Sequence, residues 1–123
     1  MNDLTMEVMR QTLELSDTVR AGLFYVQTCL EEGSLEEGFG MMEDVLDGMS
    51  SIRRAMPVIL NNLPGQGLDD SLDRLREALE YMEESHALQK PERAWAVLKT
   101  VLMPAYDEWQ EHMYRSLKRY TFC

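Results

Sequence analysis

Two carboxylate–histidine pairs are the candidates for metal binding or catalysis in this sequence. Glu83 and His86 form a Glu-x-x-His pattern, and Glu108 and His112 lie four residues apart. A carboxylate-bridged di-iron site in a helical bundle takes one Glu-x-x-His from each of two helices and one Glu from each of the other two, all facing inward. Because the sequence has no second Glu-x-x-His, it provides only half of such a site.

A metal-binding bundle with a carboxylate–histidine site around Glu83 and His86 is therefore the alternative hypothesis of function. The N-terminal half of the chain offers it few inward carboxylates, since Glu14 neighbours an apolar helical stripe and Glu43 and Asp47 flank the next one. The simpler interpretation is that the His86 ring packs near a helix end and keeps one nitrogen in water. We therefore expect no metal ligands, no catalytic residues and no cofactor.

Other catalytic chemistries have no signature in this sequence. No serine has the setting of a strand-to-helix elbow, and Gly65-Gln66-Gly67 predicts a turn instead of a phosphate-binding loop. Cys29 falls on an apolar helical stripe and Cys123 is the last residue, so neither has the spacing of a metal or redox motif. The sequence predicts a protein that is not an enzyme.

The composition predicts one folded, acidic domain that covers residues 1–123. This length suffices for a single core, and 45% of the residues are apolar. Lys and Arg total 12 against 22 Asp and Glu, and the net charge of −10 repels nucleic acid and anionic membranes. No apolar stretch is long enough to span a bilayer, and the first residues do not have the pattern of a signal peptide. We expect a cytoplasmic protein, bacterial by its plain composition.

Apolar periodicity and helix-capping signals predict an all-α fold, an up-down-up-down four-helix bundle. Gly33 is expected to end the first helix. Ser34 and Glu37 have the spacing of a capping box at the start of the second, and Asp69 or Asp70 is expected to cap the third. The predicted helices cover residues 4–32, 34–62, 69–89 and 91–120.

Prolines mark one helix start and two disturbed positions. Pro91 suits the first residue of the fourth helix, where its missing N–H costs nothing. Pro57 and Pro104 fall inside predicted helices. Each removes one backbone hydrogen bond and frees the carbonyl four residues earlier, so each is expected to kink or interrupt its helix.

The two halves of the chain align at a shift of 56 residues, which places Tyr25 on Tyr81 and Phe39 on Trp95. The alignment suggests a duplicated αα-hairpin. Because 56 is a multiple of seven, any two helical seams in phase would align in the same way.

The second predicted helix carries a long seam, the set of positions that packs helix on helix. One half of the seam recurs every seven residues and the other half lies between its members. The first half is Leu35, Met42, Met49, Met56 and Leu63, and the second is Phe39, Leu46, Arg53 and Leu60. A seam of this length predicts a helix packed against other helices over most of its length.

Arg53 departs from the apolar pattern of its seam. A charged group cannot be buried alone there without a large desolvation cost. Three arrangements stay open: the guanidinium reaches out to water, it pairs with an acid such as Glu14 or Asp107, or this end of the seam opens onto a partner.

Methionines cluster on the same helix, at Met41, Met42, Met49 and Met56. Flexible thioether side chains fill irregular cores, and they also line surfaces that accommodate partner helices. If part of this Met-rich face is exposed, it would bind an amphipathic helix or a second copy of the chain. The candidate partner-binding residues are Met41, Met42, Met49, Arg53 and Met56.

The stretch from Tyr25 to Ile52 contains the motifs Glu31-Glu32-Gly33, Leu35-Glu36-Glu37-Gly38, Val45-Leu46 and Asp47-Gly48-Met49. In these motifs it resembles a bacterial family of small helical proteins of unknown function. The size and acidity of the chain are also similar to those of flagellar and secretion export chaperones, which sequester a helix of a client protein. The resemblance implies no particular client-binding residue.

The function predicted from the sequence is a non-enzymatic protein-binding or assembly module, similar to a chaperone or adaptor. Its partner would be another protein or a second copy in a homodimer, with no nucleic acid and no membrane involved. The Met-rich face of the second helix is the expected contact.

Overall fold

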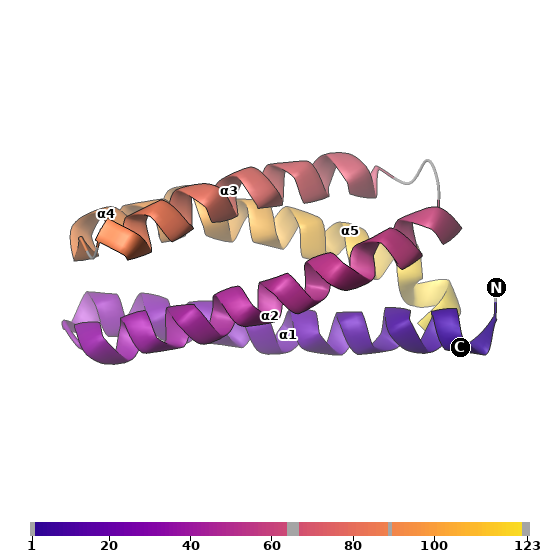
Figure 1. Cartoon of the computed structure of the whole chain (residues 1–123), viewed down its shortest axis with the longest axis horizontal. Coiled ribbons are helices and arrows are strands. Elements are labelled where there is room, and N and C mark those ends of the chain that lie inside the picture. The colour runs from indigo at the N-terminus through magenta and orange to yellow at the C-terminus, as the bar shows by residue number, and fades with distance from the viewer. Residues whose placement is uncertain (1, 64–66, 89, 122–123) are drawn as a thin grey trace.

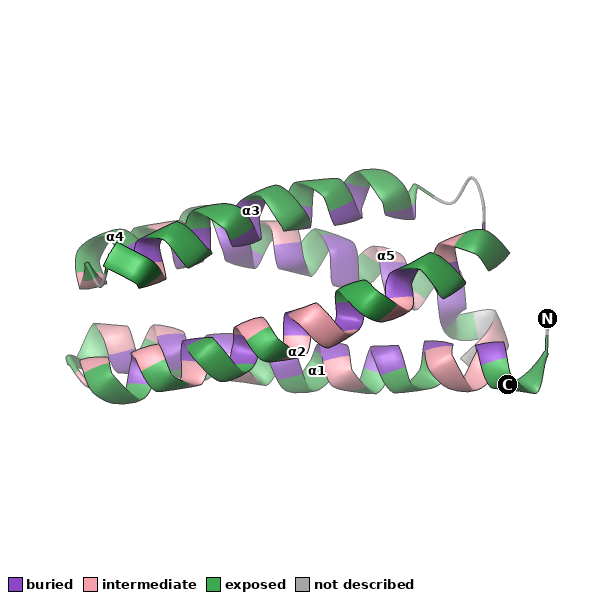
Figure 2. Cartoon of the chain, in the orientation of Figure 1, coloured by how far each residue is buried: buried purple, intermediate pink, exposed green. Residues whose placement is uncertain are grey.

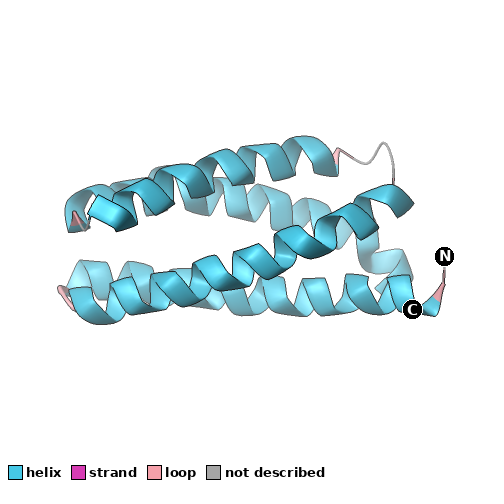
Figure 3. Ribbon diagram, viewed as in Figure 1, coloured by secondary structure: helices cyan, strands magenta, loops and turns pink. Residues whose placement is uncertain are grey.

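The computed structural model describes residues 2–63, 67–88 and 90–121, without the side chains of residues 119 and 121, and all regular structure in these ranges is helical (Figure 3). Four helices run up, down, up and down, and the fourth consists of three consecutive segments (Figure 1). The predicted all-α four-helix bundle is confirmed. The elements are α1 (Asp3–Glu32), α2 (Leu35–Asn62), α3 (Leu68–Leu88), α4 (Pro91–Val97), the π-helical segment η1 (Leu98–Leu102) and α5 (Met103–Thr121).

The helices form two layers around one core. α1 packs along α2 in one layer, α3 packs on α5 in the other, and α1 also contacts α5, whereas α2 approaches α3 at few positions. Figure 2 shows the buried residues on the sides of the helices that face one another. None of the helices in the described ranges has the length and apolar character needed to cross a membrane.

Two glycines bring α1 and α2 into close contact. A Cβ atom at Gly48 would lie 2.7 Å from Cγ2 of Val19, and one at Gly22 would lie 2.8 Å from Cγ2 of Val45. Each helix therefore inserts a valine into a notch that a glycine leaves in the other. No larger residue fits at either glycine unless the neighbouring valine moves, and valine is stiff at χ1.

The α1–α2 turn confirms one predicted cap and corrects another. Gly33 adopts a left-handed conformation with φ 81°, and its N–H and that of Ser34 both donate to the carbonyl of Cys29. Ser34 makes no side-chain capping bond, so the predicted capping box with Glu37 is wrong. Its ψ of 66° lies outside the extended region that an N-cap residue normally adopts, so Ser34 lacks the usual backbone geometry of a side-chain cap.

The start of α3 also differs from the prediction. Gly67, with φ 77°, accepts a hydrogen bond from the N–H of Ser71, and α3 begins at Leu68. Asp69 and Asp70 therefore lie within the first turn, where the positive end of the helix dipole stabilises their carboxylates. Neither of them is the cap residue.

The two internal prolines have different effects. α2 continues through the exposed Pro57 to Asn62, so an interruption there is not observed. The fourth helix does change at Pro104, because the ring cannot approach the carbonyl of Thr100 as an α-helix requires. The chain makes a π-turn directly before the proline, in which the N–H of Met103 donates to the carbonyl of Leu98.

The structure confirms one of the two predicted sets of seam positions on α2 and not the other. Met42, Met49 and Met56 are buried, but the alternate buried positions lie one residue earlier than expected. The structure buries Val45, Ile52 and Ile59 in place of Leu46, Arg53 and Leu60. The cause is the notch at Gly22, which fixes Val45 toward α1 and so sets the rotation of the whole helix.

Replacement of Gly48 by alanine is expected to destabilise the bundle relative to the same change at Gly40. Both substitutions gain about 1 kcal/mol of helix propensity. Only Gly48→Ala must displace Val19, since nothing lies within 4 Å of a Cβ at Gly40. Urea unfolding should show Gly48→Ala less stable than Gly40→Ala by about 1–3 kcal/mol.

The difference should shrink in a Val19→Ala background, where the methyl group that clashes is gone. Equal stability of Gly40→Ala and Gly48→Ala in the unsubstituted background would contradict the close contact.

Candidate functional site

The first carboxylate–histidine pair is not assembled in the structure. His86 is largely buried, and its Nε2 lies 3.4 Å from Oε1 of Glu43 on α2. Its ring packs against Phe39 with 5.5 Å between the ring centroids. Glu83 is exposed and has no ion pair or hydrogen bond within the described part of the chain. His86 therefore connects α3 to α2 and does not share a site with Glu83.

The second pair is separated in a similar way. Glu108 forms an ion pair with Arg74 of α3, and this hydrogen bond holds the pKa of the Glu108 carboxyl below its usual value. His112 lies next to Gly67, where a Cβ would be 3.3 Å from its Cε1. Across residues 2–63, 67–88 and 90–121, no three His, Cys, Asp or Glu side chains gather closely enough to hold a metal ion.

The five candidate partner-binding residues do not share one surface of the folded chain. Met42, Met49 and Met56 belong to the core. Met41 is half-buried, with its Sδ 3.6 Å from the position of a Cβ at Gly22, so it fills space between α1 and α2. Arg53 is exposed. A partner of the closed bundle would reach Arg53 and part of Met41 only.

The seam assignment of Arg53 needs correction. Ile52 takes the buried position beside it, and the guanidinium of Arg53 extends into water without an ion pair to any described residue. Neither Glu14 nor Asp107 pairs with it, because Glu14 binds Arg10 and Asp107 binds Arg20. Of the three arrangements considered above, the structure has the guanidinium in solvent.

A polar cluster that the sequence analysis missed joins α1 to α5. Tyr106 donates to the carbonyl of Ser16 at 2.6 Å, and Gln110 donates to Ser16 Oγ at 3.1 Å and to Asp17 Oδ1 at 2.9 Å. Tyr114 donates to Asp17 Oδ2 at 2.5 Å. The donors recur every four residues on one side of α5, a spacing that the sequence does contain. The donors of this α1–α5 polar cluster find their hydrogen-bond acceptors within the protein, so the cluster stabilises the packing of α1 against α5.

Burial and the Asp17 carboxylate act on the two tyrosines of the cluster. Burial raises the pKa of Tyr106 well above its usual value, and the negative charge of Asp17 adds to the effect. Partial burial, together with the hydrogen bond to Asp17, raises the pKa of Tyr114 to about 12. Both tyrosines therefore stay protonated as donors at neutral pH, and neither is positioned as a base.

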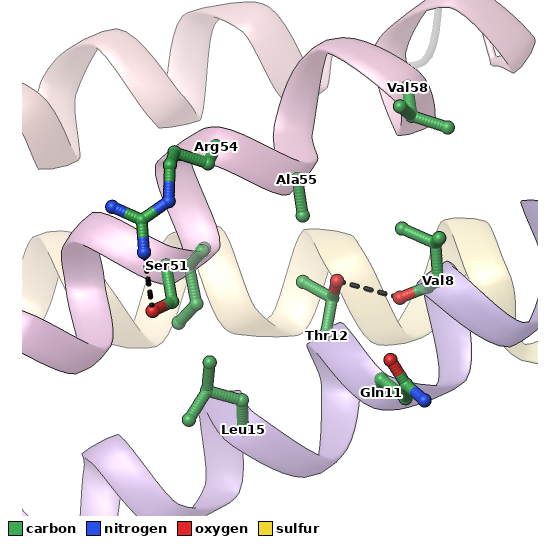
Figure 4. Close-up of a pocket in the computed structure, with 9 residues that line it drawn as sticks. Val8, Gln11, Thr12, Leu15, Ser51, Arg54, Ala55 and Val58 are labelled. Carbon is green, nitrogen blue, oxygen red and sulfur yellow. Dashed lines mark hydrogen bonds between the residues drawn. The ribbon is translucent and has the colours of Figure 1, made fainter.

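A groove with a volume of about 440 Å³ lies between the first half of α1 and the second half of α2 (Figure 4). Two polar groups on its walls already have local partners, since Thr12 donates to the carbonyl of Val8 and Arg54 donates to Ser51 Oγ at 3.1 Å. What remains unfilled is mostly apolar. The groove is lined by Val8, Gln11, Thr12, Leu15, Ser51, Ile52, Arg54, Ala55 and Val58.

A second hollow, of about 560 Å³, lies where the end of α1 meets α4. Trp95 forms one wall and donates from Nε1 to Oε1 of Glu31 at 3.3 Å. The Lys99 ammonium lies 4.8 Å from the centre of the Trp95 ring. This Trp95 hollow combines apolar walls with two carboxylates, and it is lined by Leu30, Glu31, Pro91, Glu92, Trp95 and Ala96.

Residues 7–112 match a family model described as Domain of unknown function (DUF8042). The matched range includes the whole groove and the whole Trp95 hollow. No curated protein and no solved structure matches the chain.

High pH is expected to weaken the α1–α5 polar cluster. A tyrosine whose pKa is raised from 10.0 in the unfolded chain to about 12 in the folded protein stabilises the fold below pH 10. This contribution is lost as the pH rises from about 10 to about 12. Urea unfolding across this window should therefore show a smaller loss of stability for Tyr114→Phe than for the unsubstituted chain.

Tyr81→Phe is the matched control, because Tyr81 is exposed on α3 and its hydroxyl has no described partner. Tyr81→Phe should lose as much stability over this pH range as the unsubstituted chain does. An identical pH dependence of Tyr114→Phe and Tyr81→Phe would contradict the role assigned to the cluster.

Proposed function

We propose that this chain, which belongs to the DUF8042 domain family, is a non-enzymatic protein-binding module of the bacterial cytoplasm. In this proposal it binds an amphipathic helix of another protein, as a chaperone or adaptor does. The α1–α2 groove carries the proposal, because it is the unfilled apolar surface that two packed helices leave beside their closest contact.

The shape of the groove favours a helix as the occupant. Its walls are about two turns of α1, from Val8 to Leu15, and two turns of α2, from Ser51 to Val58. Helices recognise such grooves through apolar residues on one face, three or four positions apart. Val58 is 41% exposed although it is apolar, and a docked helix would remove it from water.

The charges beside the groove specify the occupant further. Arg54 lines the groove, and its guanidinium donates to Ser51 while no described carboxylate pairs with it. By contrast, carboxylates pair with Arg10, Arg20, Arg74, Arg76 and Arg93. We therefore propose that the bound helix carries an Asp or Glu at the edge that meets Arg54.

The Met-rich face has a supporting part in this proposal. Met49 and Met56 lie in the core on either side of Ile52, which lines the groove. Unbranched thioether side chains can repack with little strain. They would let α2 adjust when a helix enters the groove, so the buried methionines contribute adaptability in place of direct contact.

A photo-crosslinking residue in the groove tests the proposal in native cell extract. We expect the crosslinker at position 58 to capture a defined protein, and the same group at Val101 not to capture that protein. Val101 is a suitable control because it is apolar and exposed but lies on the fourth helix, outside the groove.

Charge in the groove should abolish capture without unfolding the bundle. Ala55→Glu, assayed with the crosslinker at position 58, should reduce the captured amount by at least about tenfold, since a carboxylate buried against a partner has no counterion. Val101→Glu should leave the amount unchanged, and thermal melts should show both variants folded. Equal capture by Ala55→Glu and Val101→Glu, or capture at position 101 alone, would contradict the proposal.

A further inference from the structure

The fourth helix carries a ridge of exposed side chains that the bundle leaves uncovered. We call this set the outer ridge. No member forms an ion pair or hydrogen bond through its side chain with another described residue, and only Lys99 has a contact, over the Trp95 ring. The outer ridge consists of Glu92, Lys99, Pro104, Glu111 and Lys118.

Contacts on both sides of the ridge place it between the side of the fourth helix that faces α1 and the side that faces α3. Residues on one side of the helix reach α1, and residues on the other side reach α3. The flanking contacts are Trp95–Glu31 and Asp107–Arg20 toward α1, and Arg93–Glu84 and Glu108–Arg74 toward α3. Between these contacts, the ridge side chains form no ion pair or hydrogen bond with the described part of the chain, although Lys99 lies over the Trp95 ring and Glu92 lines the Trp95 hollow.

The π-turn is what aligns the two halves of the ridge. Glu92 and Lys99 are seven residues apart, as are Pro104, Glu111 and Lys118 in succession, so each group lies on one face. Lys99 and Pro104 are five residues apart, which in an uninterrupted α-helix would put them about 140° apart. η1 takes up one extra residue between them, which reduces the difference to about 40°.

The order of charges along the outer ridge is self-complementary. Glu92 and Lys118 lie thirteen residues on either side of position 105, and Lys99 and Glu111 lie six residues on either side of it. A two-fold axis near this position would therefore bring each carboxylate opposite a lysine of a second, antiparallel copy. In such an isologous contact, each of the two kinds of ion pair forms twice in one dimer.

The Trp95 hollow supplies the apolar part of this contact. It adjoins Glu92, the ridge position that would meet the second copy's Lys118. A lysine stem can lie on the indole ring while its ammonium reaches Glu92 and Glu31. The ring already takes part in a cation–π contact with the Lys99 ammonium of the same chain.

We propose that the outer ridge is a homodimer surface, in which two chains pack antiparallel with Glu92 opposite the second copy's Lys118 and Lys99 opposite its Glu111. Pro104 lies close to the axis and gives the two helices an apolar contact there. A single ridge buries little area, so the dimer is weak and reversible. The outer ridge is separate from the α1–α2 groove, which lies on other helices. A negative result for one surface therefore does not bear on the proposal for the other.

Sedimentation equilibrium of the full chain tests this arrangement through charge reversal. Glu92→Lys and Lys118→Glu should each weaken dimerisation by about tenfold or more, because like charges then face each other. An equimolar mixture of the two variants should form heterodimers, since both contacts become complementary again. The double variant Glu92→Lys/Lys118→Glu should dimerise like the unsubstituted chain.

Matched controls carry the same charge changes away from the ridge, Glu77→Lys on α3 and Arg53→Glu on α2, and should leave dimerisation unchanged. Quenching of tryptophan fluorescence by acrylamide should decrease as the protein concentration rises and the dimer forms. It reports on Trp95, because Trp109 is fully buried. Three results would overturn the proposal: a monomer at concentrations up to about 1 mM, equal behaviour of ridge and control variants, or assemblies larger than a dimer in the mixture.

Discussion

The reciprocal contact of two glycines with two valines is the constraint on which the rest of this structure depends. Val19 and Gly22 lie three residues apart on α1, Val45 and Gly48 lie three residues apart on α2, and each valine enters the notch of the other helix. This contact sets how closely the helices approach and how α2 is rotated. It explains which residues of α2 are buried, and why Arg53 is left in water.

The same contact also explains where the groove lies. The close glycine–valine contacts lie at Gly22 and Gly48. α2 draws away from α1 over its C-terminal half, toward the start of α3 (Figure 1). The residues that follow Gly48 line the groove together with the first half of α1. A tight packing point followed by divergence leaves apolar walls that no side chain in the described ranges fills.

α1 connects the two layers by chemically different means. Toward α2 it uses shape, through glycine and valine. Toward α5 it uses polar groups, since Ser16 and Asp17 accept hydrogen bonds from Tyr106, Gln110 and Tyr114. Hydrogen bonds of this kind fix the rotation of the fourth helix about its axis, because the donors recur every four residues. The rotation in turn directs the outer ridge away from the core.

The sequence predicts the helices and their order because helix ends depend on local chemistry. Gly33 and Pro91 act through their own backbone, and both mark their boundaries as expected. The rotation of α2 could not be predicted in this way. The heptad pattern admits Val45 or Leu46 at the buried position, and the choice depends on Gly22, which is distant in sequence.

The candidate site was harder to predict for the same reason. A stripe of methionines has the same pattern in a core as on a binding surface, so Met42, Met49 and Met56 could not be assigned from spacing alone. Glu83 and His86 have ligand spacing, but the side chain that reaches His86 is Glu43 of another helix. The repeated Val-x-x-Gly pattern was visible in the sequence, yet its meaning requires knowing that the two helices are antiparallel neighbours.

Nuclear Overhauser contacts in protein labelled at the valine and leucine methyl groups give the sharpest test of the glycine–valine contact. We expect two strong cross-peaks between the helices, from the Val19 methyl groups to the α-protons of Gly48 and from the Val45 methyl groups to those of Gly22. Leu46 should show no contact to α1 at this level. Absence of both valine–glycine cross-peaks, or contacts from Leu46 to Gly22 in place of Val45, would contradict the glycine–valine contact.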